Sequence, residues 1–459
     1  MSLRSRVIRN MFFSLASRRM GNRFAREYHE RCASQWRSRQ ELIDLQRGRL
    51  QRLLQHALET VPFYRDWAEK EGLSLSETGD PYATILRLPV LSKRGIQQAI
   101  SERFLSEAVP ASGRIPYSTS GSTGIPFSFS VDRSMVGNKI ARYFREMTAW
   151  GIEPGTRFLK VWGAGRVTTP GTEEEQSFFT KWILRREEMS AFDLDPERAD
   201  QILRYLKERR IPVLEAYTST ASFLASRIEE IGISLPSLKT VVVSGETLTE
   251  ELETRIAKAF EAKVLNAYGS REFGRIAFSC PGGNGLHFSM EDFCAEYLDL
   301  DPPDPGGLKR LVLTCFSNRA QPFVRYDTGD LVLPSDASTC PCGRGLPLWR
   351  TVAGRMAERV VTPSGRHLSV HFLTLLLEDY ETEIRQFQAV VDRTDRLRLL
   401  VVPTDTFREE TVGRVESLLR DHVGEGMGVR IERVGEIPVT GDGKRPLLRN
   451  LSGGLAPQG

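Results

Sequence analysis

The chain has 459 residues, a formal net charge of +4 and 40% hydrophobic residues, which is ordinary for a globular protein of two or three domains. So small a charge does not by itself indicate nucleic-acid binding. The chain has no run of about 18 apolar residues, so we expect no transmembrane helix. Six cysteines in a chain of this length do not make a disulfide framework, so we expect a reduced, cytoplasmic protein.

The sequence predicts a basic N-terminal arm over residues 1–35. Residues 1–30 hold seven arginines against two glutamates, and Ile8, Met11, Phe12 and Leu15 have helical spacing. Such a helix suits peripheral contact with an anionic membrane. The alternative, which we favour, is an arm packed on its own domain or on a partner subunit of a homodimer. The apolar run over residues 11–16 is too short for a signal peptide.

Helices and strands are predicted to alternate along the middle of the chain. Residues 36–59 carry the apolar stripe of a long helix, with Pro62 just beyond it. A second helix is predicted over 195–209, because Asp195 is a good N-cap and Pro196 suits the first helical position. A third helix is predicted over 250–260, and strands are predicted over 238–244, 262–266 and 310–316. This alternation indicates the α/β fold class, in which loops at the carboxyl ends of strands carry the ligand site.

The character of the chain changes after about residue 350. Strands are predicted over 397–402 and 428–434, with a helix over 408–423 between them. We therefore predict a large domain over 36–353 and a small α+β domain over 354–459.

A loop rich in small polar residues lies between Tyr117 and Pro126. Seven of these ten residues are Ser, Thr or Gly, so the loop offers hydroxyls and approachable backbone N–H groups to phosphate oxygens. It is not a Walker A loop, because no Gly-Lys-Ser/Thr follows its glycines. Taken alone, it is equally well explained as a polar turn.

Four later segments also carry polar groups on tight turns. They are Tyr268-Gly269-Ser270-Arg271-Glu272, Arg325-Tyr326-Asp327-Thr328-Gly329-Asp330, Gly354-Arg355, and Lys444 in a Gly-Asp-Gly-Lys loop. Each alone is also explained by a surface turn, a structural ion pair or a solvated lysine.

Together, in this order and approximate spacing, the five segments resemble the acyl-adenylate-forming (ANL) superfamily. The chain is most similar to its phenylacetate–CoA ligase branch, including capsule-biosynthesis-like (CapK-type) relatives. The predicted helix over 50–64, which ends in Val61-Pro62-Phe63-Tyr64-Arg65, also looks like that branch, as do Ser244-Gly245-Glu246 and Gln386-Phe387-Gln388. The resemblance implies a large multilayer α/β N-terminal domain and a small mobile α+β C-terminal domain.

The resemblance also implies an AMP-forming acid–thiol ligase that works in two half-reactions. A carboxylic acid attacks the α-phosphorus of ATP, pyrophosphate leaves, and coenzyme A then takes the acyl group from the adenylate. The first step gathers charge on phosphates, so positioning and electrostatic stabilisation matter most.

Roles for individual residues follow from the resemblance alone. Lys444 and Glu272 would be catalytic, with Glu272 also holding Mg²⁺. Tyr268 would pack on adenine, with Gly245 and Glu246 at the base. Asp330 and Arg355 would bind the ribose. The phosphates would be cradled by Ser118, Thr119, Ser120, Gly121, Ser122, Thr123 and Gly124, with Gly269 and Ser270 in the adjoining turn.

Two departures from the family pattern affect the acceptor more than the adenylation step. Arg271 stands where the family usually has Thr or Ser before the glutamate, so a hydroxyl contact to phosphate is lost there. Ser270 is a partial substitute for that contact. Met356-Ala357-Glu358 follows Gly354-Arg355 where the hinge usually carries an Asp. An alternative function therefore transfers the acyl group to an amine, a hydroxyl or a carrier-protein thiol in polysaccharide or secondary-metabolite biosynthesis. A non-catalytic binding protein is a third hypothesis, against which the retained Lys444 argues.

A cysteine and histidine set predicts a second, metal-binding site. Cys280, His287, Cys340 and Cys342 offer three thiols and one imidazole, the ligand set of a structural zinc site. Cys294 is the alternative ligand, and small buried thiols are the alternative explanation.

The sequence says little about the acyl pocket. Trp162, Gly163, Tyr217 and Ala267 are candidates from the segments before the base-binding and Tyr-Gly loops, and an ordinary core role explains them equally well.

Overall fold

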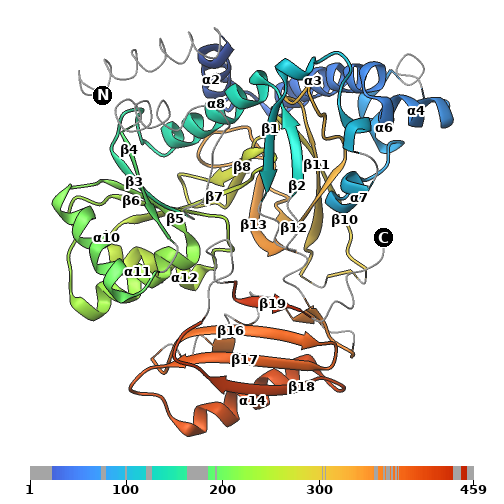
Figure 1. Ribbon diagram of the computed structural model, residues 1–459. Coiled ribbons are helices and arrows are strands. Elements are labelled where there is room, and N and C mark those ends of the chain that lie inside the picture. The colour runs from blue at the N-terminus through green and yellow to red at the C-terminus, as the bar shows by residue number, and fades with distance from the viewer. Residues whose placement is uncertain are drawn as a thin grey trace.

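The computed structural model presents a large mixed sheet with flanking helices and, below it in Figure 1, a smaller sheet. The structure describes residues 23–73, 79–98, 101–119, 127–162, 185–191, 194–301, 303–304, 306–355, 360–364, 367–368, 373, 376–377, 380, 382–437 and 446–451. The predicted N-terminal arm falls mostly outside these ranges.

Eleven strands form the large sheet, in the order β10-β11-β12-β13-β9-β8-β7-β6-β5-β3-β4. Its strands β3 to β7 run parallel and the remainder pair antiparallel, so β7 belongs to both halves. Their bounds are β3 (Phe158–Trp162), β4 (Arg186–Ser190), β5 (Val213–Tyr217), β6 (Thr240–Ser244), β7 (Lys263–Ser270), β8 (Gly274–Ser279), β9 (Leu286–Phe288), β10 (Phe293–Leu298), β11 (Lys309–Cys315), β12 (Tyr326–Pro334) and β13 (Leu348–Arg355).

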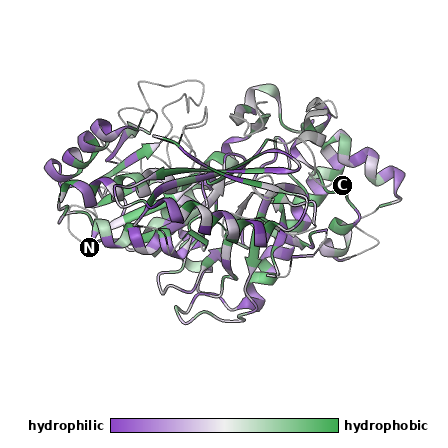
Figure 2. Ribbon diagram, turned by 90° about the horizontal axis from the view of Figure 1, so that it is seen from below, coloured by the Kyte–Doolittle hydropathy of each residue, from purple (hydrophilic) through white to green (hydrophobic). Residues whose placement is uncertain are grey.

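Three helices connect the strands of the parallel half: α10 (Pro196–Glu208), α11 (Thr218–Ile231) and α12 (Glu250–Phe260). Their apolar faces share one core with β5 and β6, in which Leu214, Val241 and Val243 are fully buried. Strands buried on both faces favour apolar runs, such as Val241-Val242-Val243 in β6. In β5 the buried Glu215 interrupts the apolar run. Helices in Figure 2 show both green and purple segments, as amphipathic helices should.

The antiparallel half shares a second core with the N-terminal helices and with a two-stranded hairpin. That hairpin, β1 and β2, flanks the Ser/Thr/Gly loop and holds the residues on either side of it, Thr119 and Phe127, opposite one another. The bounds are α2 (Arg23–Ser34), α3 (Arg39–Thr60), α4 (Pro62–Lys70), α6 (Pro81–Leu86), α7 (Lys93–Gln98), η1 (Ser101–Phe104), η2 (Ala111–Gly113), β1 (Ile115–Thr119), β2 (Phe127–Val131) and α8 (Arg133–Ala149).

The C-terminal part has a four-stranded sheet in the order β18-β17-β16-β19, with its own apolar core. One face is covered by α14, whose Val415, Leu419 and Val423 are fully buried. The bounds are β14 (Val360–Val361), β15 (His367–Leu368), β16 (Ile384–Arg393), β17 (Arg396–Pro403), α14 (Glu409–Val423), β18 (Gly428–Arg433) and β19 (Leu448–Asn450).

Most of the elements expected from the sequence are confirmed within two or three residues, and the α/β fold class is confirmed. The helix expected over 50–64 is wrong as one element: Val61 has extended φ of −110° and ψ of 114°, which ends α3 and starts α4. Proline at the first position of α4 explains the break, because the ring disfavours a helical conformation at the preceding residue. The three-part domain division stays a prediction, since Gly354 and Arg355 still pair with Leu331 and Asp330 in the large sheet. In the described part of the chain, every helix is too short or too polar to cross a membrane.

Candidate active site

The Tyr268-Gly269-Ser270-Arg271-Glu272 segment forms the tight hairpin between β7 and β8. A Cβ on Gly269 would lie 2.4 Å from the carbonyl oxygen of Gly274, so only glycine fits there. Ser270 Oγ accepts a hydrogen bond from Phe273 N at 3.2 Å, which closes the turn. The Ser270 hydroxyl thus accepts a hydrogen bond in the turn, while its O–H is not used by that bond, so its part as a substitute phosphate contact stays a prediction. Glu272 is held at the tip, with 8% of its surface exposed.

Two tyrosines link this hairpin to β12 in a reciprocal arrangement. Tyr268 Oη donates to Asp330 Oδ2 at 2.6 Å, and Tyr326 Oη donates to Glu272 Oε1 at 3.2 Å. Each motif therefore supplies a phenol that orients the carboxylate of the other. The sequence did not single out Tyr326, although it lies inside the Arg325–Asp330 motif.

The turn that carries Asp330 is built by its own side chains. Asp327 Oδ1 accepts from Gly329 N at 3.0 Å, and Thr328 Oγ1 accepts from Asp330 N at 3.1 Å. Gly329 has a φ of +71°, a conformation that favours glycine. Asp330 pairs in register with Arg355 of β13, so both candidate ribose-binding residues lie at one place in the sheet. The side chain of Arg355 lies outside the described part of the structure.

Arg325, in the same motif, is a structural residue. Its guanidinium binds both carboxylate oxygens of Glu296 at 2.7–3.0 Å, as well as the carbonyls of Leu86 and Leu88 at 3.1 and 2.6 Å. These contacts tie the segment after α6 to β10 and β12. The backbone of the motif continues the link, because Leu91 N donates to Arg325 O at 2.8 Å.

Gly245 follows β6 and lies against the aromatic candidates for the acyl pocket. Its φ is +85°, and a Cβ there would lie 3.1 Å from the Tyr217 ring. Tyr217 in turn stacks on Trp162, with ring centroids 3.9 Å apart. Ala267, the remaining described candidate, is buried beside them on β7.

Glu246 caps a helix in this structure. Its carboxylate accepts from Ser219 N at 2.7 Å and from Ser219 Oγ at 3.0 Å in the first turn of α11. Tyr217, the N-cap residue of α11, supplies no side-chain cap, so the carboxylate replaces it and also suits the positive end of the helix dipole. No local sequence pattern indicates this partner, because the contact depends on how the segment after β6 meets α11.

Three strands of the large sheet carry a group of buried charges. Glu215 of β5 contacts Lys160 of β3 at 3.4 Å and Arg275 of β8 at 2.8 Å. Burial alone would raise the pKa of Glu215, but the charges of Lys160, Arg275 and Arg186 hold it at about 2. Arg275 also donates to Ala267 O at 3.4 Å, next to Tyr268.

Several predicted site residues lie outside the described part of the chain. They are Ser120, Gly121, Ser122, Thr123, Gly124, Gly163 and Lys444. Ser118 and Thr119 end strand β1, where the structure describes their backbone. The hairpin of β1 and β2 thus brings both ends of the Ser/Thr/Gly loop together, with Thr119 opposite Phe127.

The cysteine and histidine set does come together. One ligand atom from each of Cys280, His287, Cys340 and Cys342 lies within 4.8 Å of all the others. Cys280 follows β8, His287 is in β9, and the two remaining cysteines precede β13. Cys294 lies in β10 as a buried core residue, and Cys315 is likewise buried in the core.

Comparison with known proteins gives relatives that span nearly the whole chain, although no protein-family model matches it. Protein CapK of Staphylococcus aureus is 23% identical over 451 residues, which covers 97% of each chain. Phenylacetate-coenzyme A ligase of Thermus thermophilus is 24% identical over 407 residues, covering 84% of this chain and 86% of the relative. The crystal structure of 2-hydroxyisobutyryl-CoA ligase in the postadenylation state matches with a TM-score of 0.69 over 88% of each chain, at 22% identity.

The chain has the fold of the acyl-adenylate-forming ligases. The resemblance inferred from the five motifs is thereby confirmed, including its closeness to the phenylacetate–CoA ligase and CapK-type proteins. In such an α/β fold, the carboxyl ends of the strands carry ligands. The Tyr268 to Glu272 hairpin and Gly245 lie at strand ends of this kind. Asp330 lies within β12, at an irregularity in its pairing with β11.

Proposed function

We propose that this protein activates a carboxylic acid as its acyl-adenylate, with release of pyrophosphate from ATP, and then forms a thioester with coenzyme A. The observation that carries the proposal is the reciprocal Tyr268–Asp330 and Tyr326–Glu272 pairing. This pairing supports the proposal because it orients two carboxylates, Asp330 for the ribose and Glu272 for the metal of the nucleotide in the roles proposed here. Near-full-length similarity to a phenylacetate-coenzyme A ligase supports the same reaction.

The described residues supply binding and orientation in this proposal. Asp330 accepts hydrogen bonds from the ribose hydroxyls beside Arg355. Glu272 provides an oxygen ligand for Mg²⁺, which, when bound, neutralises charge on the phosphates. The loop that follows Thr119 holds the β- and γ-phosphates, and Lys444 places its cation near the α-phosphate and the attacking carboxylate.

The direct test is acid-dependent pyrophosphate release, measured over a panel of carboxylic acids with and without coenzyme A. We expect at least one acid to give release, and coenzyme A to discharge the adenylate. No release with any acid would contradict the proposal. Lys444→Ala should lose adenylation yet still form thioester from supplied acyl-AMP, and equal loss of both steps would refute that role.

The alternative acceptor is an amine, a hydroxyl or a carrier-protein thiol. Protein CapK matches a larger share of the chain than the phenylacetate-coenzyme A ligase does, and Met356-Ala357-Glu358 replaces the usual hinge pattern. Accumulation of an acyl-AMP that coenzyme A never discharges would favour this alternative.

We further propose that Cys280, His287, Cys340 and Cys342 bind one structural zinc ion. Thiolates on one tetrahedral zinc lie about 3.8 Å apart, and Cys280 Sγ and Cys340 Sγ are 3.5 Å apart. His287 Nε2 lies 3.2 Å from Cys342 Sγ, while Nδ1 is 3.3 Å from the carbonyl oxygen of Leu346. A hydrogen bond from Nδ1 to that carbonyl would fix the ring with Nε2 toward the metal.

The zinc would join the β8–β9 hairpin to the loop before β13. That loop docks on the α2–α3 connection, where Gly345 N donates to Gln35 O at 3.0 Å and Arg344 Nε donates to Gln35 Oε1 at 2.8 Å. Metal analysis of unchelated protein should find about one zinc per chain, and its removal should lower the melting temperature. Protein without zinc that melts at the same temperature with or without added zinc would contradict this site.

A further inference from the structure

Two residues of helix α8, Lys139 and Arg142, contact the turn that carries Glu272. Neither residue belongs to a motif discussed above. Lys139 Nζ donates to Arg271 O at 2.6 Å. Arg142, one turn further along the helix, donates through Nη2 to Phe273 O. The two carbonyls belong to the residues immediately before and after Glu272. Two cations on one helix therefore grip the turn on both sides of its carboxylate.

Close packing makes this grip specific. A Cβ on Gly274 would lie 2.9 Å from Lys139 Cγ, so the lysine stem fills the space that a side chain at residue 274 would need. The ammonium also lies over the rings of Tyr117 and Phe129, 4.7 and 5.7 Å from their centroids. Both rings belong to the β1–β2 hairpin that flanks the Ser/Thr/Gly loop. Lys139 therefore contacts both the turn that carries Glu272 and the hairpin that flanks the Ser/Thr/Gly loop.

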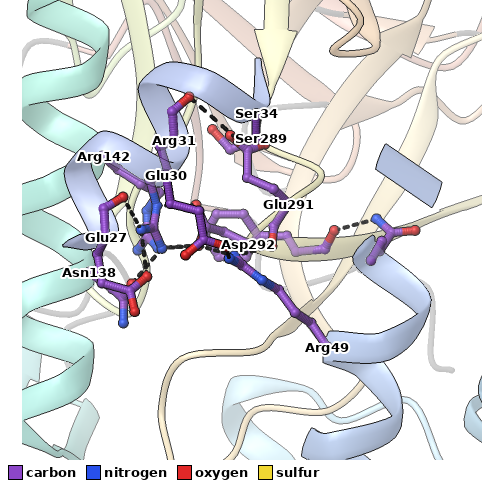
Figure 3. A network of polar contacts seen from close by, with 12 residues as sticks. Glu27, Glu30, Arg31, Ser34, Arg49, Asn138, Arg142, Ser289, Glu291 and Asp292 are labelled. Carbon is purple, nitrogen blue, oxygen red and sulfur yellow. Dashed lines mark hydrogen bonds and ion pairs between the residues drawn. The ribbon is translucent and has the colours of Figure 1, made fainter. Parts of the chain in front are cut away.

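Arg142 is anchored from the opposite side by buried charges. Its Nη1 lies 3.5 Å from Asp292 Oδ1, and Asp292 also pairs with Arg31 of α2 and, at 3.6 Å, with Arg49 of α3. Figure 3 shows Arg31, Arg142 and Asp292 pointing toward one another. Arg142 and Asp292 are essentially inaccessible to solvent. The position of α8, and with it the Glu272 turn, is thus fixed relative to α2 and α3.

We propose that Lys139 and Arg142 are positioning residues, which hold the Arg271–Phe273 turn so that the Glu272 carboxylate meets the metal of the bound nucleotide. Lys139 in addition sets the distance between this turn and the β1–β2 hairpin, through Tyr117 and Phe129. The inference rests on the proposed function. Burial lowers the pKa of Lys139 to about 8, and the charge of Glu272 opposes that shift, in keeping with their proximity.

Lys139→Met tests the proposal, because methionine keeps much of the stem and removes the ammonium. We expect the Mg²⁺ concentration that gives half-maximal pyrophosphate release to rise about ten-fold, while KM for the acid changes less than about two-fold. Lys139→Arg should restore most of the Mg²⁺ response. Arg133→Met, an exposed change on the same helix, is the matched control and should leave both values unchanged.

A double-mutant cycle shows whether Lys139 acts through Glu272. Lys139→Met should add little to the defect of Glu272→Gln if both changes disable the same carboxylate. Fully additive defects, or loss of kcat with an unchanged Mg²⁺ response, would overturn the proposal. Arg142→Lys, which keeps a buried cation, should shift the Mg²⁺ response in the same direction.

A binding measurement separates failure of this inference from failure of the proposed function. Calorimetric titration with Mg·ATP should give about ten-fold weaker binding for Lys139→Met than for wild type. Wild-type protein that binds Mg·ATP without releasing pyrophosphate would refute the ligase activity, and equal binding by the variant would overturn the positioning role. Absence of Mg·ATP binding to wild type would overturn both.

Discussion

At the scale of single residues, the tyrosine hydroxyls offer the sharpest test of the site. Tyr268→Phe removes the donor to Asp330 and keeps the ring, which packs edge-on to Trp349 at 5.8 Å. The ribose carboxylate then loses an orienting hydrogen bond. We expect KM for ATP to rise about three- to ten-fold, with a stability loss of about 1 kcal/mol, measured by steady-state kinetics and by urea unfolding.

Tyr82→Phe is a matched control for that change. Its hydroxyl donates to Gln46 Oε1 at 2.7 Å, and both residues lie in the N-terminal helices, in α6 and α3. Its loss of stability should be similar, about 1 kcal/mol, with an unchanged KM for ATP. If the two variants changed KM alike, the Tyr268–Asp330 pair would have no special part in nucleotide binding.

Gly245 combines an unusual backbone conformation with a close neighbour. Alanine there must adopt a φ of +85° and place its Cβ 3.1 Å from Tyr217. We expect Gly245→Ala to cost about 1–2 kcal/mol of stability from the backbone alone. Gly413→Ala, in the middle of α14 with no atom near its Cβ, should instead gain about 0.5–1 kcal/mol. Equal effects in thermal unfolding would show that the turn tolerates a side chain.

Single residues also show where sequence reasoning stops. The motif order predicted that Glu272 and Asp330 belong to one site, and hydrogen bonds between the two motifs support that prediction. Their partners Tyr326 and Tyr268 lie 54 and 62 residues away along the chain. Such pairings depend on how the sheet brings β7 and β12 within side-chain reach of one another, which no local pattern encodes. The contact of Lys139 with Arg271 O also joins residues that are distant in sequence. Its acceptor is a backbone carbonyl, which no side-chain pattern marks.

At the scale of elements, two helices are capped at their N-termini by a carboxylate from another segment of the chain. Glu246 caps α11, and Glu383 binds Arg408 N at 3.1 Å and also Thr411 Oγ1 at the start of α14. Neither helix has a side-chain cap from its own N-cap residue. Each contact therefore satisfies amide groups that would otherwise lack partners and fixes the helix to a neighbouring strand.

Glu246→Ala should destabilise the protein through α11. By analogy with the loss of an N-cap, we expect about 0.5–2 kcal/mol in chemical unfolding. Glu208→Ala, an exposed change at the end of α10, should stay within about 0.5 kcal/mol of wild type. A larger loss from Glu208→Ala than from Glu246→Ala would contradict the capping role.

Locally encoded elements were the ones that the sequence predicted well. The side chain of Asp195 accepts from Arg198 N at 2.7 Å and Pro196 begins α10, and α12 spans the predicted residues 250–260. The antiparallel strands β8 to β10 were not predicted, because tight turns divide the segment that they occupy. The break between α3 and α4 was also missed: its apolar stripe continues across Val61, and only the backbone conformation changes.

At the scale of the whole molecule, buried charges connect elements that are distant in sequence. Arg275 of β8 contacts Glu215 of β5 at 2.8 Å and Glu146 of α8 at 3.7 Å. The two glutamates are equally buried but differ in their partners. Glu215 is paired with two cations, whereas neither oxygen of Glu146 accepts a hydrogen bond within the described part of the chain.

Glu215 and Glu146 should therefore have opposite effects on how the stability of the protein changes with pH. The pKa of Glu215 is about 2 in the folded protein, below its ordinary value of 4.5, so its contribution is complete above 4.5 and is lost as the pH falls toward 2. Burial raises the pKa of Glu146 from 4.5 to about 8, although Arg275, Arg145 and Arg142 oppose the shift. Glu146 thus favours the folded state at low pH, and that advantage is lost as the pH rises from 4.5 through 8.

Glu146→Gln removes this titration and keeps the size of the side chain. Between pH 4.5 and about 8 the unfolded carboxyl is ionised while the folded one is protonated, so wild type loses up to about 1.4 kcal/mol per pH unit that the variant does not lose. The stability of the variant relative to wild type, from urea unfolding at a series of pH values, should therefore rise steadily and then level off above about pH 8. Glu215→Gln should show a constant deficit over the same range, because Glu215 stays ionised in both states. A flat profile for Glu146→Gln would mean that Glu146 is charged in the folded protein, held by Arg275 despite its burial.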